Sequence, residues 1–220
     1  MTEPSTTGST PESYRFTADQ RDAVYRVMAE RRDMRHFAGG AVPPAVLQRV
    51  LEAAHLAPSV GLMQPWRFLR IVDLDLRGSI AELVAVERDL TAEALGERAA
   101  DFLRLKVEGI RDCAELLVVA LGDDRDRHVF GRRTMPHMDL ASVACAIQNM
   151  WLAARAEHLG MGWVSLFDPV ELGRLLELPD GAEPVAVLCL GPVERFYDRP
   201  MLQQERWAEP RPLEELIEER

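Results

Sequence analysis

The sequence has 220 residues, of which 47% are hydrophobic and 28% charged, enough apolar material for one folded domain. Nucleic acids and anionic membrane surfaces both require a basic face, so the formal net charge of −10 predicts that neither is a partner. No apolar run approaches the roughly 20 residues of a membrane helix. Three cysteines lie far apart in apolar surroundings, which predicts buried, reduced thiols in a cytoplasmic protein: Cys113, Cys145 and Cys189.

Composition divides the chain into three parts. Residues 1–14 are polar and lack the apolar core of a secretory signal, so we expect a disordered tail. Residues 15–195 contain the apolar periodic segments and form the predicted main domain. Residues 196–220 carry several prolines and too little apolar surface to fold alone. We therefore predict that this C-terminal arm wraps around a partner subunit.

The first predicted elements are two helices. Thr17 and Gln20 form a capping box, after which apolar residues recur at helical spacing up to the sequence RRDMRHF at 31–37. Pro43-Pro44 can open a second helix, which ends before Pro58.

The rest of the main domain alternates between strands and helices. Apolar runs predict strands at residues 67–72, 116–121, 163–164 and 185–190. Helical patterns cover residues 74–110, 139–158 and 169–178. The first of these helical segments is charged and has a weak apolar stripe, so we expect a mobile helical cover at about 75–110. This alternation predicts an α/β or α+β layered domain.

The sequence RRDMRHF surrounds one acid, Asp33, with Arg31, Arg32 and Arg35. Guanidinium groups bind phosphate oxygens through paired hydrogen bonds, so the segment can hold a phosphate monoester. Spacing alone favours a simpler explanation, a cationic helix C-terminus that offsets the helix dipole.

A second candidate segment is APSVGLMQPWRF at 57–68. It offers the Ser59 hydroxyl, the Gln64 amide and the flat Trp66 ring beside backbone that proline and glycine keep out of regular structure. These groups suit a planar heterocycle with a polar rim. Either segment alone has an ordinary structural explanation, whereas the two together indicate a ligand site.

These two segments and LASVACAIQNMWLAARAEHLGMGWVS at 140–165 resemble, in the same order, the nitroreductase-like flavoprotein superfamily. The resemblance covers most of the chain. It implies an FMN-binding α+β fold with a mostly antiparallel central sheet flanked by helices, and a homodimer whose interface includes the helix at 139–158. It also implies that FMN contacts Arg31, Arg32, Asp33, Met34, Arg35, Ser59, Gln64, Ser165 and Arg211.

Departures from the usual superfamily pattern resemble one branch within it. Asp33 stands where many members have serine, Leu62 stands where many have asparagine, and GMGWVS ends in Ser165. The branch converts reduced FMN and dioxygen into 5,6-dimethylbenzimidazole, the lower ligand of vitamin B12, with erythrose 4-phosphate as by-product. The resemblance therefore implies that this chain consumes its flavin as a substrate.

The same resemblance suggests roles for individual residues. A carboxylate beside cations should stay ionised, so Asp33 is assigned to proton transfer and Ser165 to hydrogen bonding at the reactive edge of the isoalloxazine. The structural alternatives are an ion pair of Asp33 with Arg31 or Arg35, and a strand-end hydroxyl at Ser165. Residues 101–110 resemble the lid of this branch, the alternative being an amphipathic surface helix.

Other roles concern partners and electron supply. Arg211 in the arm is a candidate for the flavin phosphate of the partner subunit, or else a surface arginine. Two other functions stay open: an NAD(P)H-dependent nitro- or quinone reductase that retains FMN, and a flavin carrier without catalysis. Asp33 argues against a carrier, because an anion beside an anionic ligand lowers affinity. Candidate reductants of the flavin are NAD(P)H, acting indirectly, and a separate flavin reductase.

Three further kinds of site find little support. His128, His137 and Asp139 do not have the spacing of a compact metal-ligand set, so no metal is predicted. The context GWVSL of Ser165 is not the GxSxG elbow of a serine hydrolase. No GxGxxG follows a predicted strand, so a dedicated dinucleotide-binding motif is not expected.

Overall fold

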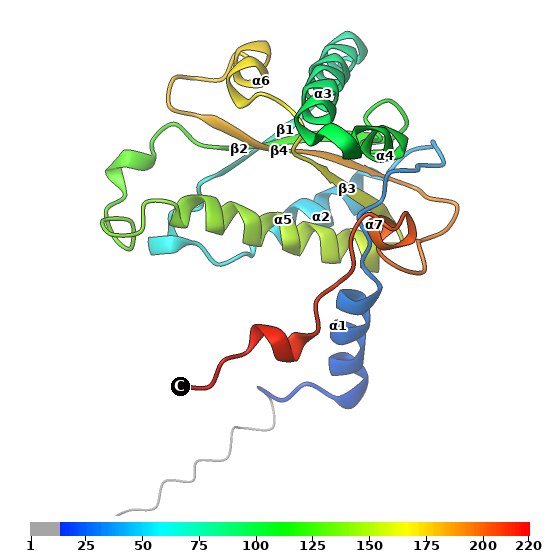
Figure 1. The fold of residues 1–220 in the computed structure, drawn as a ribbon. Helices are drawn as coiled ribbons and strands as arrows, with labels where there is room; N and C mark the ends of the chain where they lie inside the picture. Colours follow the sequence, from blue (N-terminus) through cyan, green and yellow to red (C-terminus); the bar gives the residue numbers. More distant parts are fainter. Residues whose placement is uncertain (1–13) are drawn as a thin grey trace, which may run out of the picture.

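The computed structural model describes residues 14–220, in which four strands form one antiparallel sheet in the order β1-β2-β4-β3 (Figure 1). All three strand pairs are antiparallel, as the resemblance implied. The strands are β1 (Trp66–Arg70), β2 (Glu115–Leu121), β3 (Gly160–Val164) and β4 (Glu183–Gly191). Each overlaps a strand predicted from the sequence. Thirteen residues of the predicted tail, 1–13, lie outside the described part of the chain.

Helices cover both faces of this sheet (Figure 1). On one face lie α2 (Pro44–His55) and α5 (Met138–Ala156), and on the other α3 (Leu74–Leu95), α4 (Ala99–Arg104) and α6 (Pro169–Leu175). The remaining helices are α1 (Ala18–Glu30) and α7 (Met201–Gln204), with short 3-10 turns η2 (Val60–Leu62), η3 (Gly96–Arg98), η4 (Arg125–Arg127) and η5 (Leu213–Leu216). The α+β layered class is therefore confirmed.

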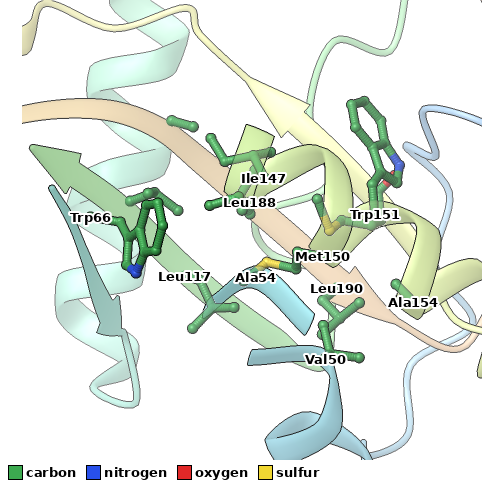
Figure 2. Packing of buried hydrophobic residues seen from close by; sticks show 14 of the residues in the cluster. Val50, Ala54, Trp66, Leu117, Ile147, Met150, Trp151, Ala154, Leu188 and Leu190 are labelled. Atoms are coloured by element: carbon green, nitrogen blue, oxygen red, sulfur yellow. The ribbon is translucent and has the colours of Figure 1, made fainter. Parts of the chain in front are cut away.

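Two apolar layers stabilise this arrangement. Every residue of β2 is buried, because the strand is central and both of its faces are covered by helices. Below the sheet, Val50 and Ala54 of α2 and Ile147 and Met150 of α5 are fully buried against β2 and β4 (Figure 2). Above it, a second cluster joins the sheet to α3 and α6.

The helix α1 projects from these layers (Figure 1). Its predicted capping box is present: Thr17 Oγ1 accepts from Gln20 N–H, and Thr17 N–H donates to Gln20 Oε1. The helix contains no buried residue, and Val24 and Met28 of its apolar stripe are 48% and 49% exposed. Most of the apolar face of α1 is therefore exposed, and the helix touches the domain mainly near its C-terminal end, where Glu30 pairs with Arg155 of α5.

Two expectations about burial were wrong in part. Ile80 and Val84 of α3 are buried in the second core cluster, so the beginning of the predicted cover at 75–110 belongs to the core. Cys113 and Cys189 are buried, whereas Cys145 is exposed, because it lies on the outward side of α5. All three thiols are unpaired, as expected. No helix of residues 14–220 is both long enough and apolar enough to span a membrane.

Candidate functional site

The segment RRDMRHF lies along the edge strand β3. Asp33 and Met161 form a parallel bridge, and Met34 N–H donates to Met161 O over 2.9 Å. Trp151 of α5 fixes both strands of this bridge, because its Nε1–H donates to Arg32 O at 3.1 Å and to Met161 O at 2.9 Å. The backbone that carries Asp33 is therefore held by a strand and a buried tryptophan.

Close approach at this edge depends on Gly162. A Cβ atom there would overlap the carbonyl oxygen of Met34 and lie 2.7 Å from Arg35 Nη1. Glycine therefore lets the segment pack directly on β3.

Both carboxylate oxygens of Asp33 accept hydrogen bonds. Trp163 N–H donates to Oδ1 over 3.0 Å, and Arg35 Nη2 donates to Oδ2 over 2.5 Å. Arg35 Nη2 also donates to Trp163 O over 2.7 Å, and the Arg35 side chain is only 9% exposed. The ion pair weighed as a structural alternative is thus present, with Arg35 as partner. Each carboxylate oxygen keeps a second lone pair for a ligand.

The pKa of Asp33 differs in direction from the expectation based on neighbouring cations. Loss of hydration raises the pKa of this carboxyl above its ordinary value, and this outweighs the lowering by Arg35, by the Trp163 N–H and by Arg31. The Asp33 side chain is still 42% exposed, so solvent reaches it from the cavity side. A raised pKa makes the carboxylate a stronger base than an ordinary aspartate.

Asp33 and Ser165 line the same cavity, which has a volume of about 200 Å³. Its polar lining residues are Asp33, Arg35 and Ser165, and the other lining residues are apolar. Arg35 Nη1 is buried and has no hydrogen-bond partner in the described part of the chain. Trp163, Val164 and Leu166 adjoin Ser165 in the lining. The remaining apolar residues, which we call the apolar wall, are Phe102, Leu105 and Val107 near α4 and Met201, Leu202 and Trp207 in the arm.

The arginines predicted to bind FMN have different partners. Arg32 donates four hydrogen bonds to carbonyl oxygens, of Ala29, Arg31, Tyr197 and Asp198, and so ties the start of the arm to this segment. The guanidinium of Arg31 stacks on Trp151, 4.5 Å from the ring centroid. Of the three, Arg31 is the one whose guanidinium no described hydrogen bond ties to a carbonyl or a carboxylate. Met34 is fully buried.

The second predicted segment lies near the other end of α5. Ser59 Oγ accepts from Gln64 N–H over 3.0 Å, and Val60 N–H donates to Oγ of Ser142 in the first turns of α5 over 3.1 Å. The RRDMRHF segment contacts Trp151, nine residues later in the same helix, which corresponds to about 13 Å along the axis. Neither Ser59 nor Gln64 lines the cavity of Asp33.

The remaining candidates lie elsewhere. Arg211 is exposed and pairs with Glu215 in η5, with 3.3 Å between Nε and Oε2, and it does not line the cavity. Asp139, weighed above as a metal ligand, is buried and instead pairs with Arg125 at 3.2 Å and Arg132 at 3.0 Å. Across residues 14–220 no cluster of three or more His, Cys, Asp or Glu side chains could hold a metal ion.

Comparison with known proteins identifies the family of this chain. The sequence profile of the nitroreductase family matches residues 28–192. The chain belongs to the nitroreductase family. The 5,6-dimethylbenzimidazole synthase of Rhodobacter capsulatus is 38% identical over 201 residues, covering 90% of this chain and 97% of the relative. The synthase of the same name from Rhodospirillum rubrum is 39% identical over 202 residues, covering 90% and 94%.

A solved structure supports the family fold. Iodotyrosine deiodinase, crystallised with FMN and 3-iodo-L-tyrosine, superposes with a TM-score of 0.66 and 24% identity, covering 80% of this chain and 94% of that chain. The resemblance of this nitroreductase-family chain to the benzimidazole-forming branch is likewise confirmed by its two bacterial relatives.

Sequence reasoning missed the apolar wall of the cavity in this nitroreductase-family chain. Met201, Leu202 and Trp207 were assigned to an arm that wraps around a partner subunit, yet they line the cavity beside Asp33 in their own chain. Their spacing has no helical or strand period. The available signal was Trp207 itself, because a large aromatic in a polar, proline-rich segment usually packs against something.

Proposed function

We propose that this chain converts reduced FMN and dioxygen into 5,6-dimethylbenzimidazole, with erythrose 4-phosphate as by-product. The observation that carries the proposal is the meeting of Asp33 and Ser165 in one cavity, in a chain 38–39% identical to two proteins named 5,6-dimethylbenzimidazole synthase. Reduced FMN supplies the ring and the ribityl carbon of the product.

The cavity has the chemistry that a flavin requires. Its apolar wall suits the face of an isoalloxazine, and its polar lining residues offer a carboxylate and a hydroxyl for the heteroatoms of the rim. Arg31 is then the arginine of the segment with donors free for the phosphate.

In this proposal Asp33 and Ser165 have separate tasks. Asp33 accepts a proton from the ribityl carbon next to the ring, for which its raised pKa makes it suited. Arg35 and the Trp163 N–H hold its carboxylate in one orientation. Ser165 provides a hydrogen bond at the edge of the ring.

We propose further that the functional unit is a homodimer. A cavity of about 200 Å³ is smaller than the roughly 300–1,000 Å³ of most ligand sites. Ser59 and Gln64 lie near the opposite end of α5, so a two-fold pairing of α5 helices brings the loop of one subunit to the Asp33 side of the other. Arg211 of the arm is a candidate for the phosphate in the partner's site.

In this scheme FMN is reduced before it binds to this protein. We assign NAD(P)H an indirect role, through a separate flavin reductase that delivers reduced FMN. The three free cysteines fit the cytoplasm, where such a supply exists.

Two variants test the assignment. Asp33→Asn and Ser165→Ala are each mixed with reduced FMN in air, and 5,6-dimethylbenzimidazole is quantified by mass spectrometry. Loss of a positioned proton acceptor lowers rates by about 10²- to 10⁴-fold, so Asp33→Asn should fall by that factor. FMN affinity of both variants serves as the control for an intact site. Undiminished product from both variants would refute the assignment.

The same assay separates the second candidate function. The nitroreductase family profile is also compatible with an NAD(P)H-dependent nitro- or quinone reductase. That enzyme would turn over nitroarenes with NADPH while its FMN stays intact. Sustained turnover of this kind, without any benzimidazole, would favour the reductase over our proposal.

A further inference from the structure

The apolar wall of the cavity comes from two segments of one chain that are far apart in sequence. Phe102, Leu105 and Val107 belong to residues 96–107, which overlap the predicted lid at 101–110 and are called the lid from here on, and Trp207 belongs to the arm. In Figure 1 α7 lies beside the edge of the domain near α4, so the arm folds back onto its own subunit before it continues. This differs from an arm that only wraps around a partner.

Trp207 joins the arm to the lid by three contacts. The guanidinium of Arg98 stacks on the indole, with 3.6 Å from its central carbon to the ring centroid. Arg98 Nη2 also donates to Trp207 O over 3.0 Å. The indole packs against Phe102, with the ring centroids 6.1 Å apart and the planes inclined at 53°.

The lid has little core of its own. Its buried cluster consists of Ala92, Phe102 and Leu105, and it is separate from the two large clusters around the sheet. Segments with few buried apolar contacts are the first to open in native proteins. Trp207 packs against this cluster and is the largest side chain there, so the arm supplies much of what holds the lid in place.

We propose that Trp207 is a positioning residue that holds the lid closed over the cavity of its own chain. Residues 196–207 then act within the subunit, and residues 208–220 remain for contact with a partner. A closed lid limits the exchange of solvent with the cavity and fixes the apolar wall against the ligand. The effect on product yield rests on the proposed function, whereas lid closure itself does not.

Hydrogen exchange tests closure in the full-length protein. Trp207→Ala removes the aromatic and cation–π contacts, so amides of the lid should exchange about tenfold faster. Trp207→Phe keeps an aromatic ring and should restore most of the protection. Leu213→Ala, a change at a 65% exposed position later in the arm, is the matched control and should leave the lid unchanged.

The yield of the reaction provides a readout that a general loss of folding would not change. When the lid opens, more reduced FMN is reoxidised by dioxygen to FMN and hydrogen peroxide, so benzimidazole formed per flavin oxidised should fall several-fold in Trp207→Ala. Free reduced FMN is reoxidised in air without any enzyme, so the enzyme is kept in excess over reduced FMN. Under that condition a smaller folded fraction keeps the ratio. Unchanged exchange in Trp207→Ala, or faster exchange with an unchanged ratio, overturns the proposal.

Failure of the proposed function gives a different result. In that case the wild-type protein forms no benzimidazole, while the exchange experiment still applies. Dissociation of FMN then replaces the ratio: release from Trp207→Ala should be several-fold faster than from wild type and from Leu213→Ala. Equal release rates from all three proteins overturn the role of Trp207.

Discussion

The two predicted ligand segments end up in contrasting surroundings. RRDMRHF is fixed to β3 and α5, and its acid faces a cavity together with Ser165. The loop with Ser59 and Gln64 is held near the other end of α5, through Ser142, and does not reach that cavity. On the proposed function, these two segments are the two halves of a site that is completed in the dimer. We call them the acid half and the loop half.

The largest expected effect is a recovery of the rate of benzimidazole formation in mixed dimers, which tests whether the two halves belong to one site. If each site combines the acid half of one subunit with the loop half of the other, a heterodimer of Asp33→Asn and Gln64→Ala chains has one intact site. Each homodimer should be impaired, and the purified heterodimer should recover about half of the wild-type rate of benzimidazole formation.

The matched control pairs two defects of the same half. A heterodimer of Asp33→Asn and Ser165→Ala chains has a defect in each of its sites and should recover no activity. Absence of recovery in the Gln64→Ala pair would mean that each site lies within one subunit. Recovery in the control would mean that Asp33 and Ser165 reach one site from different subunits.

Packing of the acid half offers a second test. Gly162→Ala places a Cβ against the Met34 carbonyl, and such overpacking costs about 1–3 kcal/mol of unfolding free energy. Gly173→Ala in α6 is the control, because its nearest contact would be an ordinary 3.7 Å. Thermal unfolding should show a lower Tm for Gly162→Ala and an equal or higher Tm for Gly173→Ala. Equal Tm values for both variants would contradict the close packing described here.

The pH dependence of the acid half provides the smallest expected effect. Activity that needs the Asp33 carboxylate falls as pH drops through its pKa, and Arg35 lowers that pKa while burial raises it. Arg35→Gln removes the lowering, so the acid limb of the pH–rate profile should move to higher pH. Arg35→Lys keeps the charge and should stay near wild type. A limb that stays in place or moves to lower pH would exclude Asp33 as the titrating base.

Much of the layered fold was predictable, because its elements have strong local signals. The apolar run of β2 and the capping box of α1 both correspond to the observed elements. Burial was harder to predict, since α5 is apolar almost all round and its periodicity did not reveal that Cys145 faces outward.

The site was predictable only in part. Asp33 and Ser165 were identified by resemblance, and their meeting in one cavity follows from the pairing of residues 33 and 161, which no local pattern encodes. The separation of Ser59 and Gln64 from them depends on the length of α5. Trp207 was missed because it acts through tertiary packing in a segment without periodicity.

The four carbonyl contacts of Arg32 have a practical meaning for anyone who redesigns this chain. Two of them involve the carbonyl oxygens of Tyr197 and Asp198, so the beginning of the C-terminal arm is anchored to the same segment that carries Asp33. Truncation of the protein before Tyr197 would remove two of the four acceptors of the half-buried Arg32 and loosen the backbone next to Asp33. The C-terminus is thus an internal support as much as an outward extension.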